Sequence, residues 1–369
     1  MTRREALGLP AIALPALTLG AVRLATAAPA PSLSSAIVRL KLKHTWTTVM
    51  SSSDFRDTLH TSYTRDGITG HGEGAPIVRY NESPESAAKT VGELRKFLLD
   101  SDPRQFSKIL AEVFRRVEGQ YAAKAAIDIA LMDWTTQKLG VPLYRYFGLD
   151  PKDAPVTTFS IGIDKPETTK AKVEEAAEYP VLKIKVGLDS DEATMEAVRA
   201  VTKKPIRVDA NEGWTDRETA VRKINWLESQ GVEFVEQPMP ADRIEDTRWV
   251  RGKVHIPIIA DESCLHAHDI AKVKDSFDGI NVKLDKAGGV LEAWRMLQIA
   301  KSFGMKTMLG CMVSSSCTVT AAAHLSPLVD YADLDGNLLI ANDPWTGVTV
   351  KNGKLILPDR PGLGLIKHT

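Results

Sequence analysis

Between Val181 and Asp285 the chain repeats one pattern, in which a short apolar run ends at a charged residue. The runs cover residues 181–186, 205–209, 232–236, 256–261 and 279–283, and their charges at Lys185, Asp209, Glu236, Asp261 and Lys283 stand 24, 27, 25 and 22 residues apart. A strand of about five residues, a loop and a helix of about a dozen residues fill such a step. Strands joined through helices are parallel, with right-handed crossovers. The pattern therefore predicts an α/β barrel whose strand-end charges meet at one mouth.

Strand–helix units continue on both sides of this stretch and predict a barrel over residues 155–337. Strands are expected over residues 157–163, 306–311 and 331–335, the last of which closes the barrel. Helices are expected over residues 167–178, 190–201, 216–230, 241–251, 266–274 and 315–325.

The segment 33–150 has a different order, because strands come first and helices follow, as in an α+β module. Residues 36–42 alternate like a half-buried strand, and Asp66-Gly67 predicts a hairpin turn. The glycine-rich run 70–74 lacks a phosphate-binding spacing and indicates close backbone packing. The small residues between Tyr121 and Trp134 predict a helix that packs tightly against a neighbour. The tail, residues 338–369, contains a hairpin signal at residues 351–354 and is expected to return to this module.

The first thirty residues are typical of an export signal rather than of a folded domain. Arg3-Arg4 precedes an apolar run rich in alanine and leucine, and small residues follow near position 27. The paired arginines indicate the twin-arginine route. The alternative is an uncleaved membrane anchor, but the prolines at positions 10 and 15 disfavour a stable span. The sequence thus predicts a periplasmic or secreted protein without a stable membrane anchor.

Composition narrows the class of partner. The 369 residues hold 47 basic and 47 acidic side chains, so the net charge is zero. This balance argues against nucleic-acid binding and favours a small-molecule site. The three cysteines make no metal-type spacing and no disulfide framework. The oligomeric state stays open, and a homo-oligomer is compatible with the sequence.

Three of the strand-end charges are carboxylates. Asp209, Glu236 and Asp261 would repel one another in one cavity, and a hard cation removes that conflict. Oxygen ligands without histidine or cysteine favour Mg²⁺ over zinc. The alternative is that each carboxylate only caps the helix that follows its strand. Three at consecutive strand ends favour the metal site.

The remaining charges are lysines. Lys183 and Lys185 alternate with apolar residues, which would turn both amines into the barrel, and Lys283 would lie roughly opposite. The alternative is an exposed lysine pair on a sheet surface. A lysine beside a cation and another lysine has a lowered pKa and acts as a base. Two opposed lysines would remove a proton from one face of a carbon and return it to the other, while the cation stabilises the resulting enolate.

These residues resemble the muconate-lactonising subgroup of the enolase superfamily. The motifs that carry the resemblance are Lys183-Ile184-Lys185, Asp209-Ala210-Asn211, Glu236-Gln237-Pro238, Asp261-Glu262-Ser263 and the run from Lys283 to Gly289. The resemblance implies a modified TIM barrel, (β/α)7β, with an α+β capping domain. It also implies that Lys185 and Lys283 are the acid/base pair, that the three carboxylates bind Mg²⁺, and that Lys183 touches the substrate carboxylate.

Within that subgroup, Asp333-Leu334-Asp335 is similar to the Asp-x-Asp of dipeptide epimerases of the L-Ala-D/L-Glu type. The resemblance implies that Asp333 and Asp335 hold the α-ammonium of a dipeptide by charge-assisted hydrogen bonds; the alternative is a polar turn. The loop 44–53 would occupy the specificity position, with Arg56 the nearest arginine and Trp46 an apolar contact. The other substrate-binding residues that the resemblance implies are Ser160, Cys311, Met312 and Val313.

The sequence therefore predicts a Mg²⁺-dependent dipeptide epimerase, an isomerase that moves a proton at the α-carbon of the C-terminal residue through an enediolate. An enzyme like o-succinylbenzoate synthase or muconate cycloisomerase is one alternative. A non-catalytic exported peptide-binding protein is another.

Overall fold

Eight parallel strands form the barrel that the repeated apolar runs predict, and they follow one another in chain order around the sheet. They are β4 (Phe159–Ile161), β5 (Leu182–Lys185), β6 (Ile206–Asp209), β7 (Val232–Glu236), β8 (Ile258–Ala260), β9 (Gly279–Lys283), β10 (Lys306–Gly310) and β11 (Tyr331–Asp333). The computed structural model describes residues 30–368. Residues 1–29, which hold nearly all of the expected export signal, lie outside the described residues.

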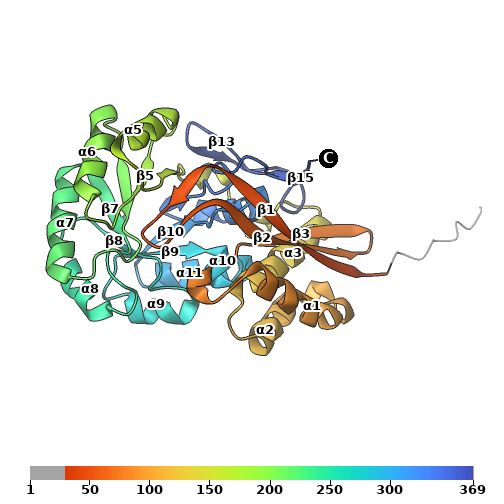
Figure 1. Cartoon of the computed structure of the whole chain (residues 1–369). Helices are drawn as coiled ribbons and strands as arrows, with labels where there is room; N and C mark the ends of the chain where they lie inside the picture. Colours follow the sequence, from red (N-terminus) through yellow and green to blue (C-terminus); the bar gives the residue numbers. More distant parts are fainter. Residues whose placement is uncertain (1–29, 369) are drawn as a thin grey trace, which may run out of the picture.

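The barrel closes where Thr157, just before β4, bridges Ala332 of β11. The backbone N–H of Thr158 also donates to the Ala332 carbonyl at 3.3 Å. Helices surround the sheet on the outside (Figure 1). They are α5 (Pro166–Glu175), α6 (Asp191–Val201), α7 (Arg217–Ser229), α8 (Ile244–Arg251), α9 (Ala267–Val273), α10 (Leu284–Ala287), α11 (Val290–Ser302) and α12 (Ser316–Ala323).

Strand β5 shows how the sequence sorts its side chains. Leu182 and Ile184 belong to the buried core that also contains Val173 of α5 and Met195 of α6. The alternating lysines of the strand point to the other side, into the barrel. Alternation alone therefore separates the apolar packing surface from the charged interior.

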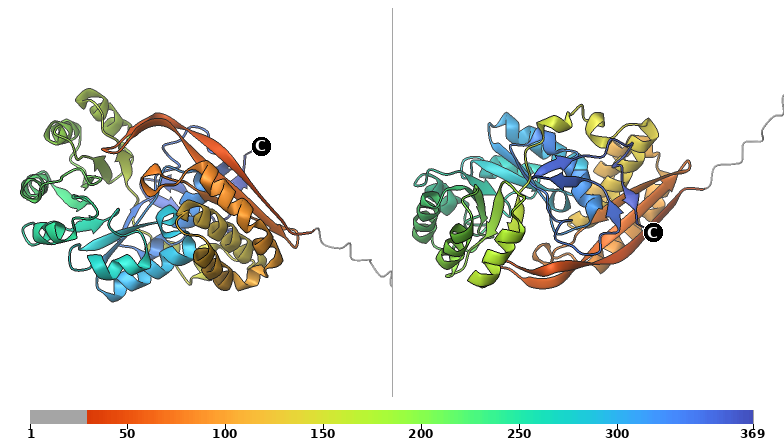
Figure 2. Two further views of the ribbon diagram at one scale, coloured as in Figure 1. Left: turned by 60° about the horizontal axis from the view of Figure 1, so that its bottom comes forward. Right: turned by 90° about the horizontal axis from the view of Figure 1, so that it is seen from above.

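The second region begins with a three-stranded antiparallel sheet in the order β1-β2-β3. Its elements are β1 (Ser32–Thr47), β2 (Ser52–Arg65), β3 (Ile68–Gly74), the 3₁₀ turn η1 (Val78–Tyr80), α1 (Pro84–Asp100), α2 (Phe106–Arg116), α3 (Tyr121–Leu139) and α4 (Leu143–Tyr146). The long β1–β2 ribbon extends from the helices across to the barrel beside α5 (Figure 2). There the Ile163 N–H donates to the Thr47 carbonyl at 2.9 Å.

The ribbon corrects one expectation. The loop expected over residues 44–53 is only four residues long, Thr48–Ser51, because β1 runs on to Thr47 and β2 starts at Ser52. The Asp66-Gly67 hairpin turn is confirmed, with φ of 54° and 75°. Both residues adopt the left-handed conformation that such tight turns need.

Glycines of β3 let the strand lie directly on α3. A Cβ at Gly70, Gly72 or Gly74 would stand 2.1, 2.0 or 2.0 Å from the carbonyl oxygen of Ala130, Ala126 or Ala122. The expected close packing of the glycine-rich run on a small-residue helix is confirmed.

We expect Gly72→Ala to lower the free energy of unfolding by about 3 kcal/mol, because overpacking forces backbone to move. Gly92→Ala is the matched control. Gly92 lies inside α1 with no atom within 4 Å of an added Cβ, and there alanine should stabilise the helix by about 1 kcal/mol. Urea denaturation of both variants measures the difference, and equal effects would contradict the packing argument.

The tail from residue 338 onward packs beside β1. The Lys43 N–H donates to the Leu339 carbonyl at 2.9 Å, and the Ala341 N–H to the Lys41 carbonyl at 2.8 Å. The predicted hairpin is confirmed, with Asn352 and Gly353 at φ of 50° and 74°. The strands of the tail are β12 (Trp345–Thr346), β13 (Thr349–Lys351), β14 (Lys354–Ile356) and β15 (Ile366–Lys367). Within residues 30–368, no helix has the length and apolar character needed to cross a membrane.

Candidate active site

Strand register brings the charged residues together at the C-terminal mouth of the barrel. Ser160 of β4 pairs with Lys183 of β5, and Lys185 pairs with Asp209 of β6. Asp209 in turn pairs with Glu236 of β7. The sequence predicted that these strand ends meet, and the pairing places each side chain beside the next.

The other half of the mouth is built in the same way. Gly310 of β10 pairs with Lys283 of β9 on one side and with Asp333 of β11 on the other. Asp261 directly follows β8, and Cys311 directly follows β10. All the strand-end residues singled out in the sequence therefore reach one region.

Lys185 and Lys283 lie on opposite sides of the barrel. Three strands separate β5 from β9 in each direction around the eight-stranded sheet. The three carboxylates lie at the ends of the strands between them, Asp209 on β6, Glu236 on β7 and Asp261 directly after β8. Lys185 Nζ donates to Asp209 Oδ2 at 2.6 Å, and Lys283 Nζ donates to Asp261 Oδ2 at 2.7 Å. Each amine thus borders a different carboxylate of one cluster.

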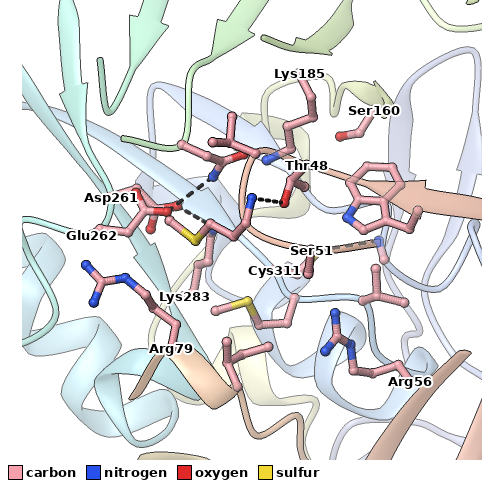
Figure 3. Close-up of a pocket in the computed structure, with 18 of the residues that line it drawn as sticks. Thr48, Ser51, Arg56, Arg79, Ser160, Lys185, Asp261, Glu262, Lys283 and Cys311 are labelled. Atoms are coloured by element: carbon pink, nitrogen blue, oxygen red, sulfur yellow. Dashed lines mark hydrogen bonds and ion pairs between the residues drawn. The ribbon is translucent and has the colours of Figure 1, made fainter. Parts of the chain in front are cut away.

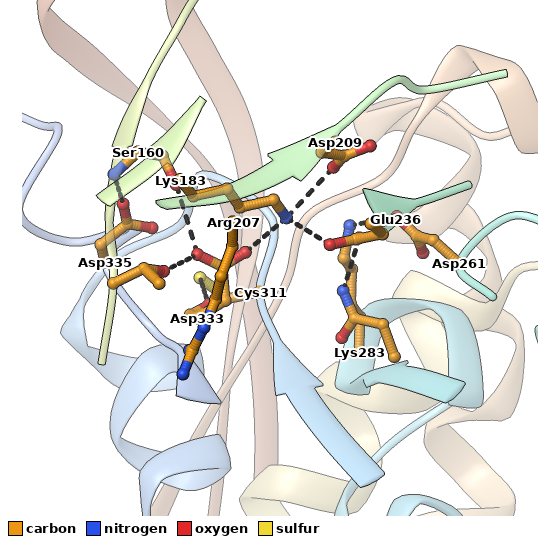
Figure 4. A network of polar contacts seen from close by, with 12 residues as sticks. Ser160, Lys183, Arg207, Asp209, Glu236, Asp261, Lys283, Cys311, Asp333 and Asp335 are labelled. Atoms are coloured by element: carbon orange, nitrogen blue, oxygen red, sulfur yellow. Dashed lines mark hydrogen bonds and ion pairs between the residues drawn. The ribbon is translucent and has the colours of Figure 1, made fainter. Parts of the chain in front are cut away.

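Lys183 is the hub of the network (Figure 4). Its Nζ lies 2.7 Å from Asp333 Oδ2, 2.7 Å from Glu236 Oε2 and 3.1 Å from Asp209 Oδ2. The side chain is fully buried. Lys183 therefore links the carboxylate cluster on β6 and β7 to the acidic residues after β11.

The three strand-end carboxylates form a buried cluster. One oxygen each from Asp209, Glu236 and Asp261 lies within 4.8 Å of the other two. They do not cap the following helices, because the N-caps of α7, α8 and α9 are Asp216, Arg243 and His266. The helix-cap alternative is therefore wrong.

The cluster fits a hard divalent cation. Two oxygens bound to one Mg²⁺ at about 2.1 Å stand at most about 4.2 Å apart, so small movements suffice. Glu236 Oε2 has no hydrogen bond, since its contact with Lys183 lacks hydrogen-bond geometry. Among the buried side chains around the cluster, six carboxyl groups face four lysines, which leaves a formal charge of −2. The carboxyl groups are Asp209, Glu236, Asp261, Glu262, Asp333 and Asp335, and the lysines are Lys183, Lys185, Lys283 and Lys286.

The pKa values record this excess of negative charge. Burial and the charge of Asp209 raise the pKa of Glu236 to about 7. Burial and Asp261 raise the pKa of Glu262 to about 8. Burial alone would lower the pKa of Lys283, but Asp261 and Glu236 outweigh it and raise the pKa well above its usual value. The sequence predicted a lowered lysine pKa beside a cation and another lysine. With carboxylates as neighbours, the pKa of Lys283 is raised instead.

A cavity of about 590 Å³ opens above this cluster (Figure 3). The capping region contributes Thr48–Ser51, Arg56 and the segment Ile77–Tyr80 to its wall. Arg79 of that segment is held by Glu212 of the barrel, with Nη2 2.9 Å from both carboxylate oxygens. The cavity is therefore closed partly by the barrel and partly by the region that precedes it.

Family models match both regions of the chain. Residues 168–366 match the enolase C-terminal domain-like family, and residues 46–148 match the N-terminal domain of mandelate racemase/muconate lactonizing enzyme. The chain belongs to the mandelate racemase/muconate lactonizing branch of the enolase superfamily. The expected family and the barrel with a capping domain are confirmed.

Named relatives of this enolase-superfamily member are epimerases. An L-Ala-D/L-Glu epimerase of Bacteroides thetaiotaomicron is 44% identical over 331 residues, which cover 89% of this chain and 86% of the relative. An L-Ala-D/L-amino acid epimerase of Pedosphaera parvula is 43% identical, with 87% and 94% covered.

Solved structures agree with this grouping. The substrate-liganded L-Ala-D/L-Glu epimerase of Bacillus subtilis superposes with a TM-score of 0.87 at 30% identity, covering 91% of this chain and 98% of the other. A dipeptide epimerase of Enterococcus faecalis, complexed with Mg and L-Leu-L-Tyr, gives 0.85 at 33% identity, covering 91% and 99%. These neighbours favour the epimerase expectation over both alternatives.

The two acids after β11 of this superfamily member have different surroundings. Asp333 is occupied, because Oδ2 accepts from Lys183 and Oδ1 accepts from Thr158 and, at 3.3 Å, from Ser160. The Asp335 carboxylate accepts only the Ser160 N–H, at 2.6 Å to Oδ2, among the hydrogen bonds of the described residues. Burial and Asp333 raise the pKa of Asp335 to about 7. Asp335 thus has an oxygen to spare, whereas Asp333 mainly holds Lys183.

The remaining residues expected to bind substrate lie on the cavity wall. Ser160, Cys311, Met312 and Val313 all line the cavity, as do Trp46 and Arg56. The Lys183 amine lies among three carboxylates of the protein. Its expected contact with the substrate carboxylate stays a prediction.

Two residues that hold the carboxylates are not evident from the sequence pattern. Asn281 Nδ2 donates to Glu236 Oε1 at 2.8 Å. Lys286 Nζ donates to the side chain of Asp261 and, at 2.8 Å, to its carbonyl. Asn281 could have been found, because it stands two residues before Lys283 and so faces the same side of β9.

Proposed function

We propose that this protein is a magnesium-dependent dipeptide epimerase that inverts the α-carbon of the C-terminal residue. The observation that carries the proposal is the pair of lysines on diametrically opposed strands, with three carboxylates on the strands between them. Named relatives with 44% and 43% identity support the same activity.

The lysines divide the proton transfer between two faces of one carbon. Lys185 or Lys283, as the free amine, takes the α-proton of the C-terminal residue. The opposite lysine, as the ammonium, returns a proton to the other face, so atoms and charge balance over the turnover. Asp209, Glu236 and Asp261 would hold Mg²⁺, which would supply positive charge against the negative charge that develops on the substrate carboxylate.

Asp335 gives the reason for a dipeptide substrate. A carboxylate with a spare oxygen on the cavity wall is suited to an ammonium group, which donates charge-assisted hydrogen bonds. The ammonium of a dipeptide and its terminal carboxylate would then be held at opposite ends. Substrates of o-succinylbenzoate synthase or muconate cycloisomerase have no such group.

Arg56 supports an acidic C-terminal side chain. It lines the cavity, its Nε is buried without a hydrogen bond, and burial lowers its pKa. No ion pair joins it to a carboxylate among the described residues, and a partly buried cation without a partner is incompletely solvated. A glutamate or aspartate side chain of the substrate would supply the missing charge.

We expect Arg56→Leu to lower kcat/KM for L-Ala-L-Glu by about 10- to 100-fold, the contribution of a hydrogen bond to a charged group. The value for L-Ala-L-Met should stay the same or rise. Arg39→Leu is the control, because Arg39 pairs with Asp57 on the outer face of the ribbon. An equal loss on both dipeptides would contradict this role for Arg56.

We also expect Mg²⁺ affinity to fall roughly tenfold per pH unit below about pH 7, since metal and proton compete for one carboxylate. The direction of this pH dependence follows from Glu236, whose pKa is raised to about 7. The group is protonated below that pH and must release its proton to bind the ion. Isothermal titration calorimetry in buffers of different ionisation enthalpy measures both affinity and proton release. An affinity that is flat across this range, or unchanged in Glu236→Gln, would contradict the assignment.

Deuterium uptake tests the activity itself. In D₂O with Mg²⁺, the α-proton signal of the C-terminal residue of L-Ala-L-Glu should disappear in NMR spectra while the D-epimer appears. A panel of dipeptides with apolar, basic and acidic C-terminal residues extends the test. No exchange with any of them would overturn the proposed function.

We further propose that the protein acts after export, in the periplasm or outside the cell. The support is the Arg3-Arg4 pair, the apolar run and the small residues that follow. N-terminal sequencing of the protein recovered from the periplasm should start near residue 30. A full-length chain in the cytoplasm would contradict export.

A further inference from the structure

A second cavity lies against the wall of the active site. Its volume is about 230 Å³, room for one large side chain rather than a whole ligand. It lies between the end of β1, strand β4, helix α5 and the segment that follows β11. Trp46, Ser160 and Leu339 line both cavities, so these three side chains form the partition.

The partition stands beside the proposed ammonium site. Ser160 donates its backbone N–H to Asp335 at 2.6 Å, and its hydroxyl lies 3.3 Å from Asp333. In an amino acid the side chain leaves from the same carbon as the ammonium. A substrate whose ammonium is held by Asp335 therefore starts its N-terminal side chain next to Ser160 and the partition.

The lining of the second cavity is mixed, with aromatic and aliphatic side chains beside the charged Lys43, Lys172, Glu175 and Glu178. Phe159 and Tyr179 stack with ring centroids 4.6 Å apart, and Leu338 adds to the apolar wall. Two of these four charges, Glu175 and Lys172, have a partner. His44 Nε2 lies 3.0 Å from Glu175 Oε2, and Lys172 Nζ lies 3.0 Å from Asp164 Oδ2.

Gly162 allows the close approach of β1 and β4 at the partition. A Cβ at this position would stand 3.1 Å from the Thr47 carbonyl and 3.5 Å from the Trp46 ring. The absent side chain lets the tip of β1 lie close to β4 with the indole between the two cavities. The two cavities are thus separated beside Ser160 by one aromatic side chain, the Trp46 indole, which a substrate side chain has to displace to enter the second cavity.

We propose that the second cavity binds the side chain of the substrate's N-terminal residue, and that the enzyme therefore takes dipeptides with a large apolar N-terminal residue such as leucine or phenylalanine. This inference rests on the proposed epimerase function. It adds a substrate class defined at the N-terminal position, whereas Arg56 concerns the C-terminal side chain.

The test compares L-Leu-L-Glu and L-Phe-L-Glu with L-Ala-L-Glu by α-proton exchange in D₂O. We expect kcat/KM for L-Leu-L-Glu to exceed that for L-Ala-L-Glu by at least roughly tenfold, the lower end of what burying a leucine side chain contributes. Leu338→Phe fills the second cavity and should lower this ratio about tenfold, whereas Leu338→Ala should raise the ratio for L-Phe-L-Glu.

Leu188→Phe is the matched control, because Leu188 is 40% exposed and lines neither cavity. It should leave the ratio unchanged, and thermal unfolding checks that each variant is folded. If L-Ala-L-Glu exchanges but the leucine and phenylalanine dipeptides do not, the subsite is overturned and the proposed function stands. The subsite is likewise overturned, and the function untouched, if neither Leu338 variant moves the ratio. If no dipeptide exchanges at all, both are overturned.

Discussion

Lys283→Ala should abolish epimerisation of L-Ala-L-Glu but leave exchange of the α-proton in one of the two epimers. Lys185 would still remove the proton on its own side and return deuterium to the same side, so the configuration is retained. Lys185→Ala should show the same behaviour with the opposite epimer. We expect epimerisation to fall by about 10²- to 10⁴-fold, the usual contribution of a general base.

Following exchange and optical rotation of L-Ala-L-Glu and L-Ala-D-Glu separately measures this. Lys306→Ala is a suitable control, since Lys306 lies at the start of β10 with a half-exposed side chain. Mg²⁺ binding should be checked in each variant, because Lys283 contacts Asp261. If either lysine variant still interconverts the epimers at the wild-type rate, opposed bases are not the mechanism.

Asp335→Asn should cost about 10²- to 10³-fold in kcat/KM for dipeptides, because it leaves a buried ammonium without its counter-charge. The same substitution should have little effect on propionyl-L-Glu, which has the shape of L-Ala-L-Glu without the ammonium. Wild type should therefore prefer the dipeptide strongly, and the variant should lose most of that preference. Comparing both substrates with both proteins isolates the contact, as in a double-mutant cycle.

Asp333→Asn provides a contrast within the same motif. Asp333 accepts from Lys183 at 2.7 Å and holds the hub of the network. Its substitution should impair both substrates together, since it releases a fully buried lysine. If Asp335→Asn also weakened both substrates equally, its proposed contact with the ammonium would be wrong.

The sequence could predict the residues that lie at strand ends. In β5, β6, β7 and β9 an apolar run stops at a charge, and period-two alternation then says which side chains enter the barrel. The family motifs cover the same positions, so pattern and resemblance identify the same lysines and carboxylates. The glycine run of β3 could be interpreted because only close packing explains alternate glycines facing a small-residue helix.

Other features depend on contacts that pattern does not contain. The hub role of Lys183 arises from contacts of its amine with Asp209 of β6, Glu236 of β7 and Asp333 of β11. The last of these lies 150 residues away in the sequence. The unequal surroundings of Asp333 and Asp335 depend on Thr158 and Ser160, which act through individual hydrogen bonds. The pattern underestimates the length of the ribbon, because polar residues near its tip are typical of loops although they pair here as strands.

The ribbon tip, Thr48–Ser51, lies in a different structural setting from the groups that carry out the reaction. The reacting groups are anchored by the hydrogen-bond ladder of the barrel, where a single inserted residue would shift every side chain beyond it. The tip touches the same cavity yet belongs to a four-residue turn that tolerates insertion and deletion. Related chains can therefore change their preferred substrate by mutation of a short surface turn, while the reacting groups stay in place.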